Sequence, residues 1–258
     1  MKKNSSWQAV KKNSSWQAVI LAGGAGTRLR PLTLNIPKPM IEVNGRPFLR
    51  HIIRELEKYG IKNLVLCVGY LADKIKGYFG CGSKFGVSIK YSVEDEYLGT
   101  AGALKHAEHL LKDDFFVLNG DTYLSADYRD IFNKFKKADK IGTMVVYDNR
   151  ENIAEENIEL DDQGMIVDYG KKEPLKKGDQ LIERKTGPKR DHKYIDAGVY
   201  VFKKELLDLI EGDKFVSLEG DIYPELIKSK QLKAYITSRR YYDLGTPERL
   251  DLIRRVLK

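Results

Sequence analysis

The 258 residues are enough to bury the core of one α/β domain, and no linker predicts a second one. No apolar stretch approaches about 18 residues, which argues against a transmembrane helix, and the amino terminus lacks the apolar segment of a secretory signal. The net charge of +8 is spread along the chain, which favours a basic surface around an anionic substrate over a nucleic-acid-binding stripe. Two cysteines suggest no disulfide framework, and we expect a cytoplasmic protein. Hydropathy and charge together predict that it binds neither membranes nor nucleic acid.

The amino terminus contains one exact repeat, because residues 2–10 occur again as residues 11–19. A single repeat of this size is no solenoid. Only the second copy runs directly into Ile20 and Leu21, so only its last residues can begin a strand. We therefore expect residues 1–15 to be a poorly ordered tail and residues 16–258 to form a single domain.

A glycine-rich turn follows the first predicted strand. The apolar residues 19–22 have the length of a buried strand, and Gly23, Gly24 and Gly26 come directly after it. Glycine lets the backbone approach a ligand closely, and successive amides in such a turn can bind an anion. The dinucleotide fingerprint fails because Leu29 stands where its third glycine belongs, and the Gly-Lys-Ser/Thr of a P-loop does not occur. On the glycines alone, a tight turn without a ligand is an equal alternative.

Cations close to this turn favour a phosphate ligand. Arg28 and Arg30 follow within a few residues and carry forked donors suited to phosphate. Lys38 stands between Pro37 and Pro39, which stiffen the segment that holds it. Together these residues predict a site for a polyphosphate.

Strand and helix patterns alternate regularly through the first half of the chain. We expect strands at residues 63–69, 87–93 and 115–119 and helices near residues 48–60, 70–79 and 99–111. Asn44 and Gly45 predict a turn before the first of these helices. This alternation argues for a largely parallel sheet that is covered on both faces.

The second half of the chain has a less regular pattern. We expect a hairpin over residues 157–169, strands at residues 141–147 and 194–202, and a helix near residues 203–210. Residues 241–245 predict a short strand and a turn. The charged residues 171–193 predict a mobile flap or loop. Ser217 could cap one helix, and Thr246 with Pro247 predicts the start of a terminal helix.

The string over residues 23–40 resembles the signature of the sugar-1-phosphate nucleotidyltransferases, G-G-x-G-T-R-L-x-P-L-T followed by P-K-P-M. It is most similar to the mannose- and heptose-phosphate guanylyltransferase branches of that family. The resemblance extends from about Trp16 over nearly the whole chain. It implies a Rossmann-like nucleotide-diphospho-sugar transferase fold, with a mostly parallel central sheet flanked by helices.

The resemblance also implies a set of site residues. Nucleotide contacts fall on Leu21, Ala22, Gly23, Gly24, Gly26, Thr27, Glu94, Gly99, Thr100 and Asn119. Catalytic cations are Arg28 and Lys38, and the Mg²⁺ ligands are Asp121 and Asp243. Sugar-phosphate contacts fall on Lys172, Asp196, Gly198 and Glu219. For either aspartate alone a structural role would be an equal alternative, but hard carboxylate oxygens suit Mg²⁺.

Three departures from the family pattern concern the sugar side. Lys171 replaces a glutamate, Asp196 replaces an asparagine, and Gly220 replaces a lysine. A sugar-hydroxyl contact expected at position 171 is therefore in doubt. These changes put the identity of the sugar in question more than they do the type of reaction.

Glu94 is the residue on which the choice of base depends. It matches a position that touches the base edge, where thymidylyl- and uridylyltransferases often have glutamine. A carboxylate only accepts hydrogen bonds, and guanine presents two adjacent donors, whereas uracil and thymine present one donor between two carbonyls. The residue therefore favours GTP, and Asp95 or Glu96 would be the reader if the register slips.

The predicted reaction joins a nucleoside triphosphate, with GTP favoured, to a sugar 1-phosphate and releases pyrophosphate, with Mg²⁺ as cofactor. The sugar is D-glycero-α-D-manno-heptose 1-phosphate or mannose 1-phosphate in this interpretation. Alternatives are a uridylyl- or thymidylyltransferase of another sugar 1-phosphate, such as glucose or MurNAc, and a non-catalytic regulatory relative that binds a nucleotide sugar. A glycosyltransferase of the same fold is a weaker alternative. A homo-oligomer is left open.

Overall fold

The computed structural model describes residues 16–151, 153–154, 157–170, 175–177, 180–182 and 193–257. The expected tail over residues 1–15, the site residue Lys172 and most of the expected flap lie outside these residues. Within the flap, β11 (Leu175–Lys177) and β12 (Gln180–Ile182) pair as an antiparallel hairpin.

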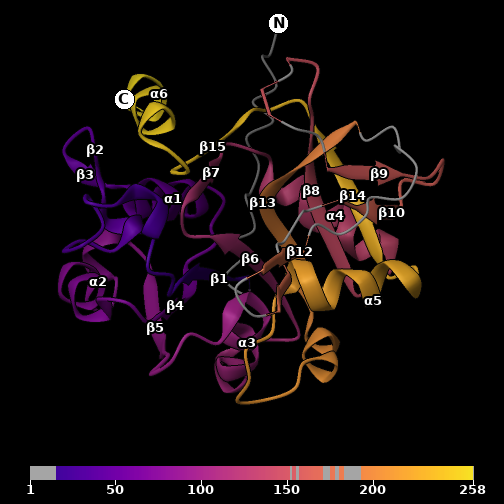
Figure 1. Ribbon diagram of the computed structural model, residues 1–258, viewed down its shortest axis with the longest axis horizontal. Coiled ribbons are helices and arrows are strands. Elements are labelled where there is room, and N and C mark those ends of the chain that lie inside the picture. The colour runs from indigo at the N-terminus through magenta and orange to yellow at the C-terminus, as the bar shows by residue number, and fades with distance from the viewer. Residues whose placement is uncertain are drawn as a thin grey trace, which may run out of the picture.

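A nine-stranded mixed sheet forms the centre of the described part of the chain (Figure 1). Its strands are β1 (Gln17–Ala22), β4 (Asn63–Val68), β5 (Ser88–Val93), β6 (Asp114–Asn119), β8 (Gly142–Asp148), β9 (Ile158–Leu160), β10 (Ile166–Tyr169), β13 (Tyr194–Lys203) and β14 (Leu232–Thr237). The helices are α1 (Phe48–Lys58), α2 (Ala72–Phe79), α3 (Gly99–His106), α4 (Tyr128–Ala138), α5 (Tyr223–Lys228) and α6 (Pro247–Val256). Short strand pairs join β2 (Glu42–Val43) to β3 (Arg46–Pro47) and β7 (Thr122–Leu124) to β15 (Tyr241–Asp243).

The order of the strands creates a crevice beside β1. The chain runs from β1 outward to β4 and β5, all parallel, and then crosses back to β6 on the other side of β1. Beyond β6 the sheet turns antiparallel at β13, which also pairs with β8. Ligands of open α/β sheets bind outside the carboxyl ends of the strands where the strand order reverses, and here that point lies between β1 and β6.

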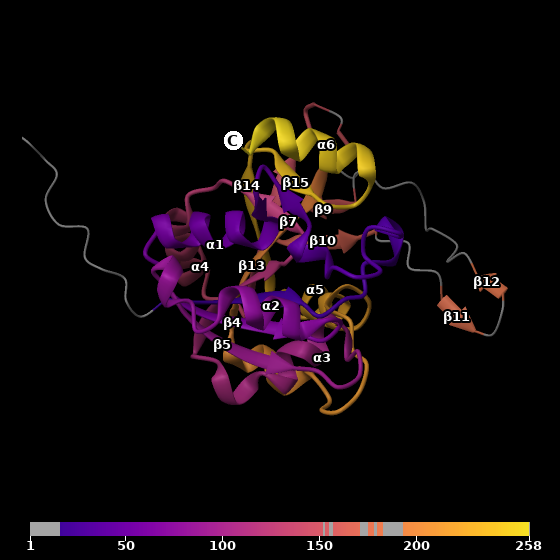
Figure 2. The same cartoon turned by 90° about the vertical axis from the view of Figure 1, so that its left-hand side faces the viewer.

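Both faces of the sheet are covered, as the continuous apolar strands predict. Ile20 of β1 belongs to a core shared with α1, α2, α4 and α6, whereas the adjacent Val19 belongs to a second core shared with α3 and α5. Figure 2 shows α1, α4 and α6 on one side of the molecule and α3 on the other. Successive side chains of a strand point to opposite faces, so a strand buried on both sides has to be apolar throughout.

Most of the expected elements are confirmed, and two of them were assigned the wrong extent or type. The helix expected over residues 99–111 ends at His106, and a 3-10 helix (Glu108–Leu110) follows it. The segment near residues 203–210 is a 3-10 helix (Lys204–Leu209). The sequence patterns also failed to predict β7, β14 and α4, although Asp127 caps α4 by accepting hydrogen bonds from the amides of Arg129 and Asp130.

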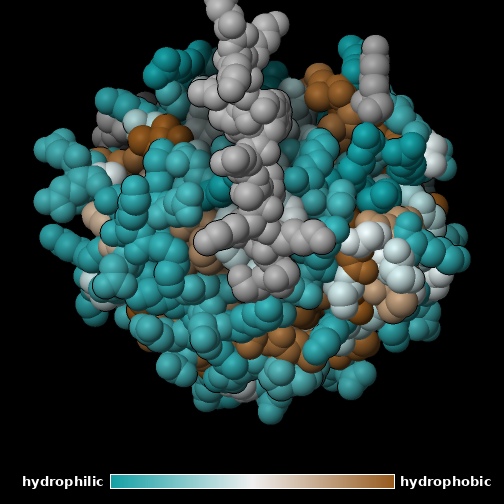
Figure 3. Space-filling model, turned by 180° about the vertical axis from the view of Figure 1, so that it is seen from behind, coloured by the Kyte–Doolittle hydropathy of each residue, from teal (hydrophilic) through white to brown (hydrophobic). Residues whose placement is uncertain are grey.

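The surface carries no large apolar belt on the face that Figure 3 shows, where hydrophobic residues form small patches between hydrophilic ones. Over the described ranges no helix is both long enough and apolar enough to cross a bilayer.

Candidate active site

A cavity of about 970 Å³ opens at the carboxyl ends of β1, β4, β5 and β6. The carboxyl ends of parallel strands meet at one edge of a sheet, so residues far apart in the sequence converge there. The site residues that the family resemblance implied all line this cavity, except Lys172, which lies outside the described residues. The sequence patterns did not single out Tyr70, Tyr97 or Arg249, which line it too.

The glycine turn after β1 is shaped for close approach. The amides of Gly24, Ala25 and Gly26 have no hydrogen-bond acceptor among the described residues, so they are available to an anion. Gly26 has a φ of +60°, and a Cβ atom there would come within 3.0 Å of the Lys38 Cβ. Glycine at this position therefore allows the turn to pack directly against the segment that carries Lys38.

The two predicted catalytic cations reach the cavity from short 3-10 helices. Arg28 lies exposed in the helix Thr27–Leu29, and Lys38 begins the helix Lys38–Met40 between the buried Pro37 and Pro39. Lys38 donates a hydrogen bond to the Asp121 carboxylate. Arg30, by contrast, is exposed and does not line the cavity.

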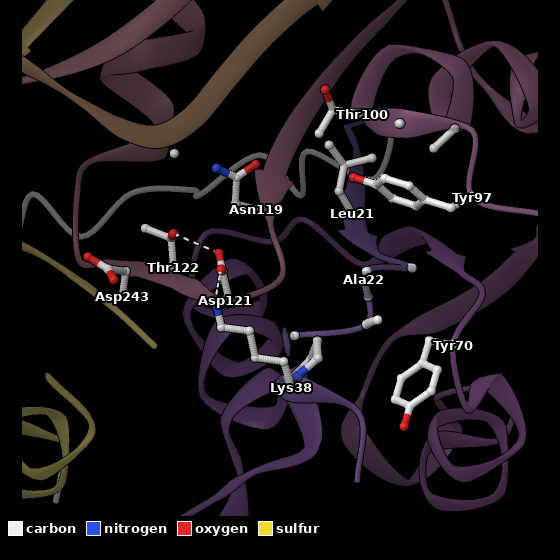
Figure 4. Close-up of a pocket in the computed structure, with 18 of the residues that line it drawn as sticks. Leu21, Ala22, Lys38, Tyr70, Tyr97, Thr100, Asn119, Asp121, Thr122 and Asp243 are labelled. Atoms are coloured by element: carbon white, nitrogen blue, oxygen red, sulfur yellow. Dashed lines mark hydrogen bonds and ion pairs between the residues drawn. The ribbon is translucent and has the colours of Figure 1, made fainter. Parts of the chain in front are cut away.

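The pairing of β7 with β15 brings the two predicted metal ligands together. Asp243 lies opposite Thr122 in the register, and the Leu244 amide donates to the Asp121 carbonyl at 2.9 Å. Thr122 Oγ1 also donates to Asp121 Oδ1 at 3.1 Å. Figure 4 shows Asp121 between Lys38 and Thr122, with Asp243 beside Thr122.

The donor set at this point fits a magnesium ion. Mg²⁺ keeps several waters and is held by one or two carboxylates together with substrate phosphates. Asp121 and Asp243 supply two carboxylates at one cavity. No group of three or more His, Cys, Asp or Glu suited to a metal occurs among the residues that the structure describes. The residues present therefore suit an ion that shares its ligands with phosphate oxygens.

Glu94 follows β5 and is a buried residue of the cavity. Glu94 is only 6% exposed, and its Oε2 accepts a hydrogen bond from the Leu98 amide at 3.1 Å. Burial raises the pKa of the Glu94 carboxyl, while the Leu98 amide and the charge of His106 act in the opposite direction. Asp95 and Glu96 also line the cavity but are exposed. A buried carboxylate selects its partners more strictly than an exposed one, so the geometry favours Glu94 as the reader of a ligand.

Gly99 has a packing role that the sequence did not reveal. Its φ is +77°, and a Cβ atom would come within 2.5 Å of the Val216 carbonyl oxygen. The residue is therefore glycine because the protein's own backbone packs against it. The neighbouring Thr100 accepts from the Leu218 amide at 2.7 Å and donates to Glu219 Oε2 at 3.1 Å. Thr100 thus links the predicted nucleotide side of the cavity to the sugar side.

Asp196 and Gly198 lie at an irregularity in β13. The register with β8 shifts between Asp196 and Tyr200, and Gly198 has a φ of +69°. The Asp196 carboxylate accepts from the hydroxyls of Tyr169 at 2.9 Å and Tyr200 at 2.8 Å, and from the Gly198 amide at 2.9 Å. Bulges are common next to active sites, and Asp196 and Gly198 at this one both line the cavity.

Glu55 of α1 anchors β7, the strand that follows Asp121 and pairs with the strand of Asp243. It is 3% exposed and accepts from Tyr123 at 3.1 Å, Ser125 at 3.0 Å and Lys58 at 2.6 Å. Burial and the adjacent Glu55 charge raise the pKa of Tyr123 to about 12, so its hydroxyl stays a donor. Because Tyr123 belongs to β7, this cluster fixes the position of Asp121 and Thr122.

We expect Glu55→Ala to lower the free energy of unfolding by about 2–3 kcal/mol, because it removes a buried side chain and leaves two half-buried hydroxyl donors without their acceptor. Urea unfolding measures the change. The control is Glu57→Ala on the same helix, whose weak contact with Lys62 spans 3.7 Å and should matter by less than about 0.5 kcal/mol. Equal losses in the two variants would show that the buried cluster does not stabilise the fold.

Several known proteins are similar to this chain in sequence or in fold. Mannose-1-phosphate guanyltransferase 2 of Candida glabrata is 37% identical over 239 residues, and mannose-1-phosphate guanylyltransferase of Mycobacterium tuberculosis is 34% identical over 236 residues. Each alignment covers 89% of this chain but 61% of the relative, so the chain spans less than two thirds of the length of these proteins.

A solved structure covers more of its own chain. HddC from Yersinia pseudotuberculosis matches with a TM-score of 0.75 and 27% identity, over 94% of this chain and 100% of that chain. The same protein has been solved in a complex with GMP-PN. The mostly parallel α/β fold that the sequence predicted is thereby confirmed. The family model for nucleotidyl transferases matches residues 17–255, almost the entire chain after the repeat, and the chain therefore belongs to the nucleotidyl transferase family.

Proposed function

We propose that the protein is a sugar-1-phosphate guanylyltransferase, which makes a GDP-sugar and pyrophosphate from GTP and a sugar 1-phosphate. The observation that carries this proposal is that one cavity is lined by the glycine turn, Lys38, two aspartates and the buried Glu94. The names of the relatives support guanylyl transfer to a mannose phosphate, and the binding of GMP-PN by HddC supports a guanine nucleotide.

In the proposed reaction, an oxygen of the sugar phosphate attacks the α-phosphorus of GTP. The bond between the α-phosphorus and the bridging oxygen breaks, and pyrophosphate leaves with that oxygen. The nucleophile is already an anion, so no general base is needed, and catalysis consists of positioning and charge neutralisation.

Each part of the site has a role in this proposal. The free amides of the glycine turn and Arg28 bind the triphosphate, and Lys38 stabilises charge at the α-phosphate. Asp121 and Asp243 would hold Mg²⁺, which when bound neutralises phosphate charge. Asp196, Gly198 and Glu219 line the sugar side of the cavity. The assignment of Lys172 to the sugar phosphate stays a prediction from the sequence, as do the cytoplasmic location and any homo-oligomer.

The test measures pyrophosphate release from GTP, UTP and dTTP in the presence of Mg²⁺. Sugar substrates are mannose 1-phosphate, D-glycero-α-D-manno-heptose 1-phosphate and glucose 1-phosphate. We expect turnover with GTP and a manno-configured sugar. A preference for UTP or dTTP would replace the proposal by the uridylyl or thymidylyl alternative. Binding of GDP-mannose without any turnover would indicate the regulatory alternative.

A glycine beside Glu94 gives a prediction about nucleotide binding. A Cβ atom on Gly23 would lie 2.7 Å from Glu94 Oε1, so Gly23→Ala has to displace the carboxylate. We expect KM for GTP to rise about tenfold to a hundredfold, because small misplacements in a positioned site are costly. The control is Gly77→Ala in α2, where a Cβ atom meets nothing within 4 Å. An unchanged KM in Gly23→Ala would separate Glu94 from nucleotide binding.

A further inference from the structure

Arg249 of α6 is a cation of the cavity that is bound to a predicted metal ligand. Its Nη1 lies 2.8 Å from Asp243 Oδ1 and 2.7 Å from Oδ2, so one nitrogen bonds both carboxylate oxygens. Arg249 is 45% exposed at its side chain and Asp243 is 19% exposed. A Cβ atom on Gly245 would lie 2.5 Å from Asp243 Oδ1 and 3.1 Å from Arg249 Nη1, so glycine at position 245 makes room for this pair.

Each of the two predicted metal ligands is thus paired with its own cationic side chain, and both of these cations line the cavity. Asp121 is paired with Lys38, and Asp243 is paired with Arg249. A divalent cation that binds the Asp243 oxygens would compete with the guanidinium for the same atoms and repel its charge. Arg249 stays charged at any physiological pH, so a change of its protonation state cannot relieve this competition.

The surroundings of Asp243 indicate what a displaced guanidinium would meet. Asp243 lies opposite Thr122, and Thr122 packs against Gly198, whose Cβ would be 3.0 Å from Thr122 Cγ2. Gly198 and Asp196 line the sugar side of the cavity. The glycine turn packs instead against Lys38, which is the partner of Asp121. The carboxylate that Arg249 holds is therefore connected through Thr122 to the sugar side, whereas Lys38 packs against the glycine turn on the triphosphate side.

We propose that Arg249 exchanges partners during binding: it holds Asp243 until Mg²⁺ takes this carboxylate, and it then binds the phosphate group of the sugar 1-phosphate. This inference rests on the proposed function. The planar guanidinium offers forked donors that match two oxygens of a phosphate, whereas a lysine ammonium offers only a point charge. The exchange couples the binding of Mg²⁺ to that of the sugar 1-phosphate. Mg²⁺ on Asp243 frees Arg249 for the phosphate, and a phosphate on Arg249 frees Asp243 for Mg²⁺.

The exchange predicts effects of opposite sign in one variant. Mn²⁺ binding to the substrate-free protein is measured by electron paramagnetic resonance of the free ion, with Mn²⁺ as the probe for Mg²⁺. Arg249→Ala should bind Mn²⁺ several-fold more tightly, because the competing cation is gone. The same variant should raise KM for mannose 1-phosphate about tenfold to a hundredfold, with KM for GTP unchanged.

Two further variants keep the test sharp. Arg249→Lys retains the charge without the fork, so its Mn²⁺ affinity should stay near that of the wild type while KM for mannose 1-phosphate still rises. Arg254→Ala is the matched control, because Arg254 lies exposed on the same helix and pairs only with Asp251, at 3.2 Å, among the described residues. It should change neither quantity, and thermal melting confirms that each variant is folded.

Several outcomes would overturn the inference. Weaker or unchanged Mn²⁺ binding in Arg249→Ala would show that Arg249 positions Asp243 for the metal or is irrelevant to it. A raised KM for pyrophosphate in the reverse reaction, without a change for mannose 1-phosphate, would assign Arg249 to the leaving group. If the wild type released no pyrophosphate from GTP, the proposed function would fail by itself. The inference would then be decided by Mn²⁺ binding and by binding of inorganic phosphate to the Mn²⁺-loaded wild type and Arg249→Ala.

Discussion

Asp121→Asn should lower kcat for pyrophosphate release about 10²–10³-fold, the loss typical of one charge-stabilising group in an active site. The substitution keeps the shape of the side chain but removes the charge that Lys38 contacts and that would bind Mg²⁺. KM for GTP should change less than kcat, because the glycine turn and Arg28 still bind the triphosphate. The measurement is steady-state release at saturating GTP and sugar 1-phosphate, with circular dichroism to confirm the fold.

The matched control for this variant is Asp139→Asn. Asp139 is an exposed aspartate that ends α4, has a φ of +48° and pairs with Lys203 at 2.7 Å, outside the cavity. Asparagine tolerates this backbone conformation, so stability and kcat should both stay near wild type. Wild-type turnover in Asp121→Asn would remove Asp121 from the mechanism and, with it, the proposed magnesium site.

The second large effect concerns the base, where GTP should exceed ITP by about ten- to a hundredfold in kcat/KM. ITP lacks the 2-amino group, so it leaves part of the buried Glu94 carboxylate without a donor. Glu94→Gln should reduce this discrimination, because the amide has one acceptor and adds an unwanted donor. Burial raises the pKa of Glu94, so on acidification this carboxylate is protonated at a higher pH than an exposed glutamate. We therefore expect kcat/KM for GTP to begin to fall at that higher pH.

The experiment compares GTP, ITP, ATP, CTP and UTP on wild type, Glu94→Gln and Glu96→Gln. Glu96 lines the same cavity but is exposed, so it serves as the matched acidic residue. Loss of discrimination in Glu96→Gln alone would transfer the reader role to Glu96. Equal use of GTP and ITP by the wild type would remove Glu94 from that role, and a preference for UTP would refute guanylyl transfer itself.

Features set by neighbouring residues could be predicted from the sequence. The apolar run of β1, the glycine turn after it and the Thr246 cap of α6 depend on a few adjacent residues, and each is present as predicted. The convergence of site residues also followed from local patterns, because strands that are parallel end at one edge. These features could therefore be predicted before any contact between distant segments was known, whereas the strands β7 and β14 could not.

Only the tertiary structure decided which distant segments meet. The pairing of β7 with β15 places Asp243 beside Asp121 and brings Arg249 into the cavity. The packing of Val216 explains why residue 99 is glycine, a role that the sequence pattern had connected to the base. Periodicity and capping report local backbone preferences. Which strands pair, and which residue packs against a given glycine, depends on long-range contacts that local sequence patterns do not report.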